Sequence, residues 1–421
     1  MTVIGVDDTD SRERGMCTTY LASQLADRLR QRSRVERTLL VRLNPAVPYK
    51  TRGNAALAIH TDLGSESAFD LAYELIDEFA ETADEHTDPG LVVAPGSAES
   101  VDPRVSEFAR TAVIDFHDLD STLSLADATG LRHAGWKSGR GRIGALAAIG
   151  AWTAFDDWTV EHIAYRAPDR WGTPREVDVD SVFAAADRAY PAAWDTVDHG
   201  ESDPVCVPHT PGPVLYGIRG DDLEAVRQVA GGIDSEPAET AELFLANQGT
   251  DAHLQPGEIG GLAEGRAYRV TGSVTDPPAT RRGGHVFLRI ENGSRRLECA
   301  AFEPTKRFRD RVRALRAGDR VTVCGEVSEA TLKLEKFAVR SLVTTERTTP
   351  TCSGCGRRME SAGADQGYRC RDCDTTAPGK VKRPIDRDLE RGWYEVPPCA
   401  RRHIAKPLVR GGFDAPVHPE R

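Results

Sequence analysis

Three carboxylates lie within four residues near the start of the chain, at Asp7, Asp8 and Asp10. They follow residues 2–6, a short apolar run that predicts a buried strand. Mg²⁺ prefers oxygen ligands, and proteins usually hold it with one or two carboxylates together with substrate phosphates. The segment therefore predicts a catalytic Mg²⁺ site at the end of a strand, with an ordinary acidic turn as the alternative.

The segment 15–20 (GMCTTY) ends where a helix is predicted to begin. Apolar residues at helical spacing from Leu21 to Leu29 predict that helix. The free backbone N–H groups of a helix N-terminus favour phosphate, and Thr18 or Thr19 could also serve as a plain N-cap. The two interpretations are compatible with each other.

A glycine-rich segment, residues 135–144 (GWKSGRGRIG), precedes a second helix of small residues. Its glycines match the GxGxxG pattern of dinucleotide-binding proteins, but no apolar strand precedes them, so we reject that interpretation. What remains is a cationic loop at a helix N-terminus, which suits a triphosphate or an RNA phosphate. A mobile surface loop is the alternative. The residues predicted to bind phosphate are Lys137, Arg140, Gly141, Arg142 and Gly144.

Four of the nine cysteines form a Cys-x2-Cys-x14-Cys-x2-Cys pattern, at Cys352, Cys355, Cys370 and Cys373. Two such pairs of thiolates complete a tetrahedral site, so the pattern predicts a structural Zn²⁺ with no open position for catalysis. Two redox pairs are the alternative, but the strand-to-helix context of such pairs is missing. Basic side chains and a tyrosine between the ligands suit nucleic acid, although a solvated surface would look the same.

The elements that must position these residues suggest several domains. Strands and helices alternate in residues 1–154, which favours an α/β or α+β domain. Residues 155–262 fit a β-α-β-β-α-β unit, with helices at 182–194 and 223–229 and a linker rich in glycine and proline at 255–265. Predicted strands of the first domain are 2–6, 39–43, 55–60 and 91–94, and its predicted helices are 18–30, 69–79, 105–111 and 145–152.

From residue 263 the pattern changes to short strands. Five strands with a helix-like stretch, 305–315, between the third and the fourth are the order of an OB-fold β-barrel, which we assign to residues 263–345. Residues 346–421 hold the zinc ribbon and a basic tail. The predicted fold class is thus multidomain α+β. The predicted barrel strands are 267–274, 285–290, 296–301, 320–327 and 332–339.

The net charge of −11 conceals a polarity along the chain. Residues 261–421 carry 32 Lys and Arg against 21 Asp and Glu, whereas residues 1–260 carry 22 against 44. A basic part suits a phosphate backbone, and two independent surfaces are the alternative. The scarcity of lysine, 8 against 46 arginines, resembles proteins adapted to high salt. The longest apolar run is too short to span a membrane, and no secretory signal is visible, so a cytoplasmic location is expected.

Five segments together resemble the archaeal agmatinylcytidine synthetases of isoleucine tRNA, and an OB-fold and a zinc ribbon follow them in the family's order. The resemblance covers essentially the whole chain. The segments are GVDDTDS at 5–11, GMCTTYLA at 15–22, KTRGNAALAIH at 50–60, GWKSGRGRIGALAAIGA at 135–151 and PHTPGPVLYGIRG at 208–220.

The resemblance implies a kinase-like N-terminal domain that binds ATP and Mg²⁺, followed by a ferredoxin-like domain that helps to bind agmatine. The implied reaction attaches agmatine to C2 of the wobble cytidine in the CAU anticodon, so that the tRNA reads AUA instead of AUG. ATP is consumed to AMP and phosphate. Phosphorylation would turn the C2 oxygen into a leaving group, and this transfer needs cations around the phosphates more than covalent chemistry from the protein.

The family's phosphorylated threonine maps onto Thr18, which with the three aspartates forms the expected catalytic set. Agmatine is a dication, so its pocket should offer carboxylates or carbonyls, and the cytidine must leave its stack to enter. The expected partners are the tRNA, agmatine and ATP, with no membrane and no obligate protein partner indicated. The expected agmatine-binding residues are Asp115, Asp118, His209, Thr210 and Pro211.

Two rival functions follow from the same residues. The OB-fold and the ribbon alone would suit a non-catalytic nucleic-acid-binding protein. A small-molecule kinase with an RNA-binding tail is the other rival. The clustered aspartates beside a helix start that carries threonine, together with the cationic glycine loop, favour an enzyme over a simple binder.

Overall fold

Nine strands within residues 2–246 form one sheet, in the order β5-β4-β1-β3-β2-β9-β6-β8-β7. The computed structural model describes the chain except residues 12–14, 51–52 and 403. Strand β1 (Thr2–Asp7) pairs antiparallel with both β3 (Ala55–Thr61) and β4 (Gly90–Pro95). Its residues 2–6 are buried, because it lies inside the sheet and is covered on both faces.

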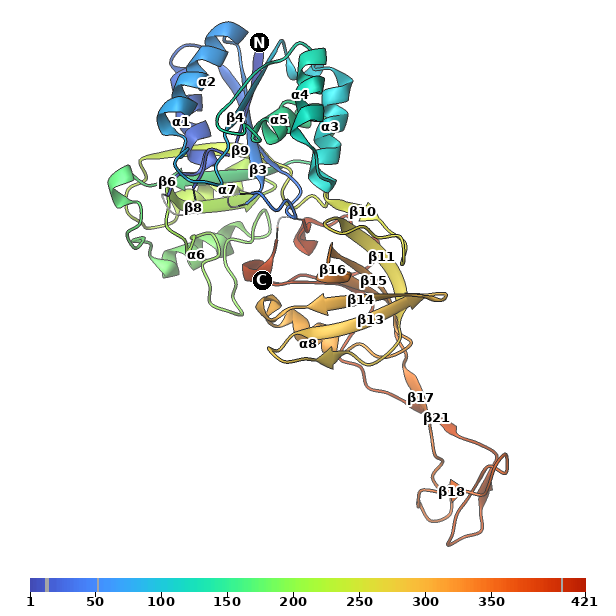
Figure 1. The fold of residues 1–421 in the computed structure, drawn as a ribbon. Coiled ribbons are helices and arrows are strands. Elements are labelled where there is room, and N and C mark those ends of the chain that lie inside the picture. The colour runs from blue at the N-terminus through green and yellow to red at the C-terminus, as the bar shows by residue number, and fades with distance from the viewer. Residues whose placement is uncertain (12–14, 51–52, 403) are drawn as a thin grey trace.

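Helices cover both faces of this part of the sheet (Figure 1). Helices α1 (Thr18–Arg30) and α2 (Ser65–Phe79) pack on the face that carries Ile4 and Val6. Helix α5 (Arg142–Ala154) packs with α3 (Pro103–Ile114) on the face that carries Val3. Successive residues of β1 point to opposite faces, so the last residues of this strand emerge between two helical layers.

The sheet continues without a break into the second unit. Strand β2 (Val35–Arg42) pairs in parallel with β9 (Thr240–Ala246), opposing Leu39 to Leu245 and Leu40 to Ala246. The predicted boundary between residues 154 and 155 thus falls within one continuous sheet. The remaining elements of this unit are β6 (Thr159–Tyr165), α6 (Val179–Ala189), β7 (Ala193–Trp194), β8 (Val214–Gly220) and α7 (Leu223–Gly231).

The predicted helix 182–194 is wrong at its C-terminal end. Helix α6 stops at Ala189, and Tyr190 is extended, with φ −66° and ψ 138°. Pro191 follows it, and a residue before proline is driven out of the helical region. The elements of this sheet that were not predicted include β9 itself, α4 (Leu119–Ala128), β5 (Arg132–Gly135) and the two-residue strand β7.

The second sheet closes into a five-stranded barrel. Strand β11 pairs with β13 and β15, β13 with β14, and β16 with both β14 and β15. Between β14 and β15 the predicted helix is split into a 3-10 turn, Glu303–Thr305, and α8 (Phe308–Arg313). The barrel strands are β11 (Ala267–Val274), β13 (Val286–Asn292), β14 (Arg295–Ala301), β15 (Arg320–Ser328) and β16 (Thr331–Ser341).

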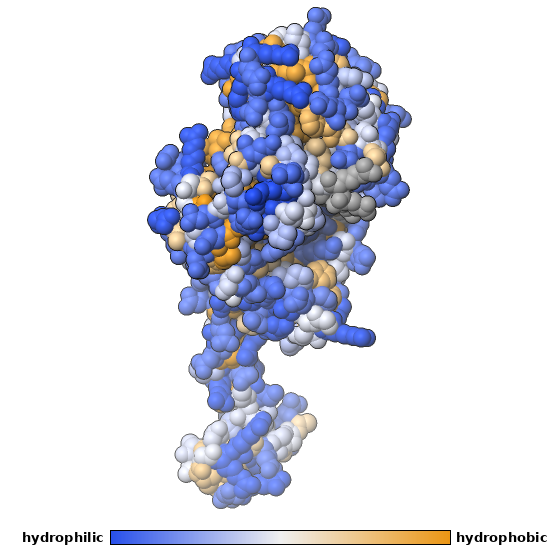
Figure 2. All heavy atoms as spheres, turned by 90° about the vertical axis from the view of Figure 1, so that its left-hand side faces the viewer, coloured by the Kyte–Doolittle hydropathy of each residue, from blue (hydrophilic) through white to orange (hydrophobic). Residues whose placement is uncertain are grey.

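A narrow stalk carries the cysteine ribbon away from the barrel (Figure 1). It consists of β17 (Thr345–Thr348) paired with β21 (Val381–Pro384). Figure 2 shows the ribbon standing out beyond the main body of the molecule. No helix in the described part of the chain has the length and apolar character needed to cross a bilayer. The ribbon strands are β18 (Glu360–Ser361), β19 (Tyr368–Arg369) and β20 (Thr376–Ala377).

After the ribbon the chain returns to the barrel instead of ending in a free tail. Strand β22 (Gly392–Glu395) pairs with β16, and β23 (Val417–His418) pairs with β22. Trp393 is 1% exposed and belongs to a small apolar cluster with Leu408. The C-terminal segment from β22 onward is therefore part of the barrel's packing. Two further short strands, β10 (Leu254–Pro256) and β12 (Ala279–Thr280), join its edge.

Candidate functional site

A cavity of about 420 Å³ opens at the C-terminal end of β1. Its walls are the start of α5, the loop from β2 to β3 and the loop from α3 to α4. Apolar side chains, among them Leu43, Val47 and Ile143, line it together with carboxylates. The predicted site residues that line it are Asp7, Asp8, Asp10, Asp115, Asp118, Arg140, Gly141 and Gly144.

The glycines of the predicted phosphate loop let α5 approach β1 closely. A Cβ at Gly144 would lie 1.9 Å from Oδ2 of Asp7, and one at Gly141 would lie 2.7 Å from the carbonyl oxygen of Asp7. On the strand, a Cβ at Gly5 would lie 2.2 Å from the carbonyl oxygen of Ala145. These positions require glycine because other atoms already occupy the space of a side chain. The helix N-terminus therefore lies directly against the aspartates.

The three aspartates form a strongly negative cluster. Burial raises the pKa of Asp7 well above its usual value, and the neighbouring Asp8 and Asp10 raise it further. Asp8 is in the left-handed region, with φ 58°, and its carboxylate accepts the backbone N–H of Asp88 at 3.0 Å. Asp88 in turn accepts the N–H of Ser138 at 2.9 Å, which ties the cluster to the glycine loop. Carboxylate oxygens gathered in this way fit a hard divalent cation.

Thr18 lies behind the aspartate loop and does not line the cavity. It is the first residue of α1, and its side-chain oxygen accepts the N–H of Thr9 at 3.3 Å. Cys17 precedes it as an extended N-cap whose side chain makes no capping bond. The threonine hydroxyl is thus buried beside the backbone that connects Asp8 to Asp10.

The predicted phosphate-binding cations do not all reach the cavity. Arg140 lines it and stacks over the ring of Tyr49, with 4.2 Å from the guanidinium carbon to the ring centre. Lys137 donates to the carbonyl oxygens of residues 84 and 85, at 2.6 and 3.1 Å. Arg142 donates to the carbonyl oxygen of Gly139 at 2.9 Å. Both of these side chains hold the glycine loop in its shape.

The predicted agmatine-binding residues fall into two separate places. Asp118 lines the cavity as the N-cap of α4, and the N–H and hydroxyl of Ser121 lower its pKa. Asp115 also lines the cavity, and Arg266 donates to it. His209, Thr210 and Pro211 lie on the loop before β8, where His209 has a side chain that is 80% exposed. They do not line the cavity.

Sequence reasoning did not assign several residues of the cavity. Tyr49, Asn54, Phe116 and His117 all line it. The segment 50–60 was quoted only for its resemblance to the family, and nothing in its composition indicates which sheet edge it would meet. Thr51 and Arg52 of that segment are outside the described residues.

A buried carboxylate on β6 was also missed. Glu161 is 3% exposed and lies between two arginines on one face of the sheet. It accepts a hydrogen bond from Arg219 at 3.2 Å, and its other oxygen lies 3.9 Å from the guanidinium of Arg42. Arg219 belongs to the segment 208–220 and Arg42 ends β2. A charged residue at a buried strand position is the signal that would have found it.

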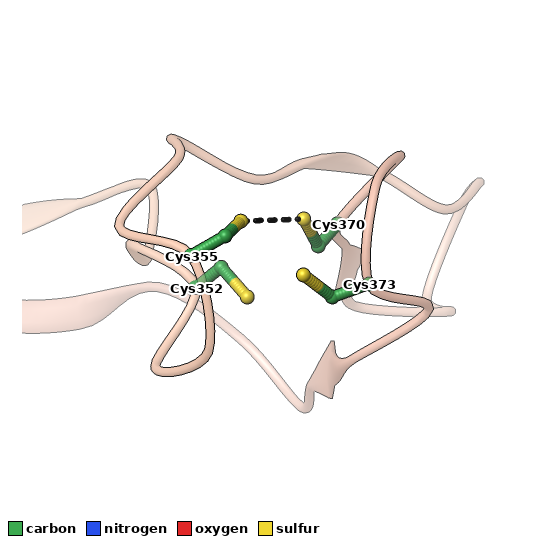
Figure 3. A group of neighbouring side chains, drawn as sticks. All are labelled: Cys352, Cys355, Cys370 and Cys373. Carbon is green, nitrogen blue, oxygen red and sulfur yellow. Dashed lines mark hydrogen bonds between the residues drawn. The ribbon is translucent and has the colours of Figure 1, made fainter.

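The four predicted cysteines come together in the ribbon (Figure 3). Their sulfur atoms lie within 4.8 Å of one another, with 3.5 Å between Cys355 and Cys370. Sulfur atoms bound to one tetrahedral zinc lie about 3.8 Å apart, so the set fits Zn²⁺. Hydrogen bonds, first from the Thr375 hydroxyl and then from backbone N–H groups, lower the pKa of Cys352 to about 6. A thiolate is therefore favoured at this position.

Three family models match the chain. Residues 3–67 match the TiaS TCKD domain, residues 139–253 the TiaS FLD domain and residues 349–389 the TiaS C-terminal zinc ribbon domain. The last match confirms that the cysteine motif belongs to a zinc ribbon.

Full-length relatives carry the same family name. The isoleucine tRNA 2-agmatinylcytidine synthetase TiaS of Haloquadratum walsbyi is 53% identical, with 100% of each chain covered. The enzyme of the same name from Methanosarcina mazei is 46% identical, with 97% of each chain covered. The similarity to these relatives thus extends over essentially the whole chain.

Solved structures agree with the sequence comparison. A crystal structure of apo TiaS, an isoleucine tRNA agmatidine synthetase, matches with a TM-score of 0.89 at 42% identity and covers 100% of both chains. A complex of TiaS with isoleucine tRNA and ATP matches with a TM-score of 0.89 at 41% identity, covering 100% of this chain and 99% of the other. The chain therefore belongs to the TiaS family of isoleucine tRNA 2-agmatinylcytidine synthetases.

Proposed function

We propose that the chain attaches agmatine to C2 of the wobble cytidine of the CAU-anticodon isoleucine tRNA, using ATP. The product, 2-agmatinylcytidine, makes the tRNA read AUA instead of AUG. Family membership supports this proposal, as do solved relatives in complex with isoleucine tRNA and ATP and with AMPCPP and agmatine. The observation that carries it is the cavity in which three aspartates meet a helix N-terminus and Arg140.

The chemistry needs the C2 oxygen of cytosine to leave. A phosphoryl group is transferred from ATP to that oxygen with ADP as the leaving group, the primary amine of agmatine attacks C2, and the oxygen departs with phosphate. Hydrolysis of the β-phosphate of ADP then accounts for AMP and a second phosphate. The amine loses a proton as the new C–N bond forms. Such phosphoryl transfers are accelerated mainly by positioning and by cations around the phosphates, which is what this cavity offers.

Asp7, Asp8 and Asp10 would hold Mg²⁺, which supplies charge neutralisation for the phosphates. The N-terminus of α5, at Gly141 and Gly144, and the guanidinium of Arg140 present further positive charge to the same space. Lys137 and Arg142 would support this site by fixing the glycine loop. Thr18 is proposed as the phosphorylated threonine, beside the aspartate loop.

Agmatine carries two positive charges and therefore needs acceptors. Asp118 and Asp115 are proposed for it at the cavity, and the exposed loop His209–Pro211 is proposed to contribute from the second unit. This loop continues into Gly212, whose Cα would lie 3.7 Å from a Cβ placed on Gly15 of the GMCTTY segment. The loop thus lies beside the GMCTTY segment, which leads into Thr18.

The remaining parts have supporting roles in this proposal. The nine-stranded sheet would comprise a kinase-like and a ferredoxin-like domain, the five-stranded barrel would be an OB-fold, and the cysteine ribbon would hold a structural Zn²⁺. The barrel and the ribbon would grip the tRNA. A cytoplasmic location follows from the substrates, ATP and tRNA.

A single assay tests the function. Radiolabelled agmatine, ATP and Mg²⁺ are incubated with isoleucine tRNA transcripts that have a CAU anticodon or a matched GAU anticodon, and label in RNA is counted. ATP-dependent incorporation only with CAU is the expected result. ATP turnover without RNA would instead indicate a small-molecule kinase, and tRNA binding without either activity would indicate a non-catalytic binder.

A further inference from the structure

The barrel contacts the wall of the cavity through the residues that lead into β11. The guanidinium of Arg266 donates two hydrogen bonds to Asp115, from Nε to Oδ1 at 3.2 Å and from a terminal nitrogen to Oδ2 at 2.5 Å. This two-pronged geometry fixes the orientation of a carboxylate as well as its charge. Asp115 lines the cavity, so a side chain of the second sheet holds part of the wall of the first.

Two neighbouring contacts strengthen this junction. Gly265 has φ +72°, and a Cβ there would lie 2.7 Å from the ring of Phe116, which also lines the cavity. The buried side-chain amide of Asn44 donates to the carbonyl oxygen of Gly265 at 3.0 Å. The same asparagine receives a hydrogen bond from Asn54, another residue of the cavity wall, at 2.7 Å.

Backbone hydrogen bonds also fix residues 265–266 to the barrel. The N–H of Gly265 donates to the carbonyl oxygen of Val327, and the N–H of Val327 donates to that of Arg266, each at 2.9 Å. Val327 belongs to β15. Backbone hydrogen bonds of this kind pass a displacement of the barrel directly to Arg266, and so to the loop that carries Asp115.

We infer that Arg266 is a positioning residue for the reaction: it holds the 115–118 loop of the cavity in place from the barrel. This inference rests on the proposed function. The barrel, which is proposed to hold the RNA, and the cavity, which the cytidine must enter, then keep a fixed position relative to each other. The pair is about one-third exposed on both sides, and ion pairs this exposed add little to stability. Loss of the pair should therefore affect the catalytic rate more than folding.

The experiment compares Arg266→Ala with Arg281→Ala in the full-length protein. Arg281 is the matched control because it is also a barrel arginine, it is paired to Glu298, and it has no contact with the cavity residues described. Each variant is assayed for tRNA Kd, for kcat of agmatine incorporation at saturating tRNA and for Tm. Arg266→Lys keeps the charge and loses the two-pronged geometry.

We expect Arg266→Ala to lower kcat at least tenfold, with a tRNA Kd within twofold of that of Arg281→Ala and an almost unchanged Tm. Arg266→Lys should be intermediate. Because Asp115 is itself proposed to bind agmatine, Asp115→Ala should lose at least as much activity as Arg266→Ala, and the double variant should be no worse than Asp115→Ala, because Arg266 acts through Asp115.

A wild-type kcat in Arg266→Ala would overturn the inference. A loss of agmatine incorporation that a weaker tRNA Kd alone explains, and that Arg281→Ala shares, would overturn it as well. Fully additive losses of kcat in the double variant would also overturn it, because Arg266 would then not act through Asp115. Failure of the proposed function is distinguishable from these results: the wild-type protein itself would then incorporate no agmatine into the CAU transcript.

Discussion

Ionisation of the buried Asp7 carboxyl group lowers the stability of the folded protein. Its pKa is raised by burial and by two neighbouring carboxylates, so the folded state binds its proton more tightly than the unfolded state does. Stability is therefore lost as the pH rises through the folded-state pKa of Asp7. A bound cation would offset this cost by pairing with the ionised carboxylate.

We predict that Asp7→Asn raises Tm in Mg²⁺-free buffer at pH 7 and abolishes agmatine incorporation. The gain in Tm should shrink toward pH 4, where the wild-type carboxyl holds its proton. Added Mg²⁺ should raise Tm more for the wild type than for the variant. Thermal unfolding across pH measures this, with Asp156→Asn, an exposed aspartate, as a control that should change nothing. A lower Tm for Asp7→Asn at pH 7 would refute the electrostatic account.

Thr18 carries a second prediction at the residue scale. Its hydroxyl accepts the N–H of Thr9 within the aspartate segment. Thr18→Ala should lower agmatine incorporation by at least 100-fold, leave the tRNA Kd within about twofold, and lose about 1 kcal/mol of stability with the hydrogen bond. Thr18→Ser keeps a hydroxyl and should retain much of the activity. Full activity in Thr18→Ala would remove Thr18 from the catalytic set.

At the scale of elements, the strongest sequence patterns gave correct elements. The run 2–6 is β1, the spacing from Leu21 to Leu29 is α1, and the five alternating segments form the barrel. These succeeded because burial on one or two faces leaves a periodic trace in a single segment. The cysteine spacing succeeded for a different reason, because a tetrahedral site restricts it.

Other elements depend on distant partners and leave no such trace. Strand β9 pairs with β2, which lies more than 190 residues earlier in the chain. The sequence around β9 does not indicate this partner. The cavity shows the same limit: the aspartates and the glycine loop were predicted separately, whereas Tyr49 and Phe116 are recognised only once two loops meet. Lys137 and Arg142 had the right charge, but their hydrogen bonds go to the loop backbone.

The course of the chain through the ribbon leads to a prediction about truncation. Cutting after residue 345 removes β22, whose Trp393 and Tyr394 are buried against the barrel, so that variant should be unstable. Thr348 and Val381 are paired across the stalk. Replacing residues 349–380 by a two-glycine turn should therefore preserve the Tm of the barrel while weakening tRNA binding at least tenfold. Filter binding and thermal unfolding test this, and unchanged tRNA affinity would contradict the ribbon's role.

For the whole molecule, the uneven distribution of charge along the sequence also contributes to the contacts between its two parts. The basic excess of residues 261–421 was interpreted as a phosphate-binding surface. Several of these cations instead form ion pairs with aspartates of residues 1–260. These ion pairs join the two parts of the chain. These pairs are Arg266 with Asp115, Lys336 with Asp251, Arg307 with Asp198, Arg401 with Asp195, and Arg410 with Asp157 and Asp221. Opposite charges therefore help to fix the relative position of the cavity and the barrel.

The pair of Lys336 and Asp251 makes this argument testable. The Lys336 side chain is fully buried, and its ammonium donates to both carboxylate oxygens, at 2.7 and 2.6 Å. Asp251→Ala leaves that cation buried without its counter-ion and should cost about 3–5 kcal/mol of unfolding free energy. Adding Lys336→Met should recover much of the loss, because an apolar side chain has no charge to desolvate. Glu298→Ala, which breaks the exposed pair with Arg281, should cost less than about 1 kcal/mol. Urea unfolding measures all four proteins, and equal losses for Asp251→Ala and Glu298→Ala would show that this buried pair does not hold the halves together.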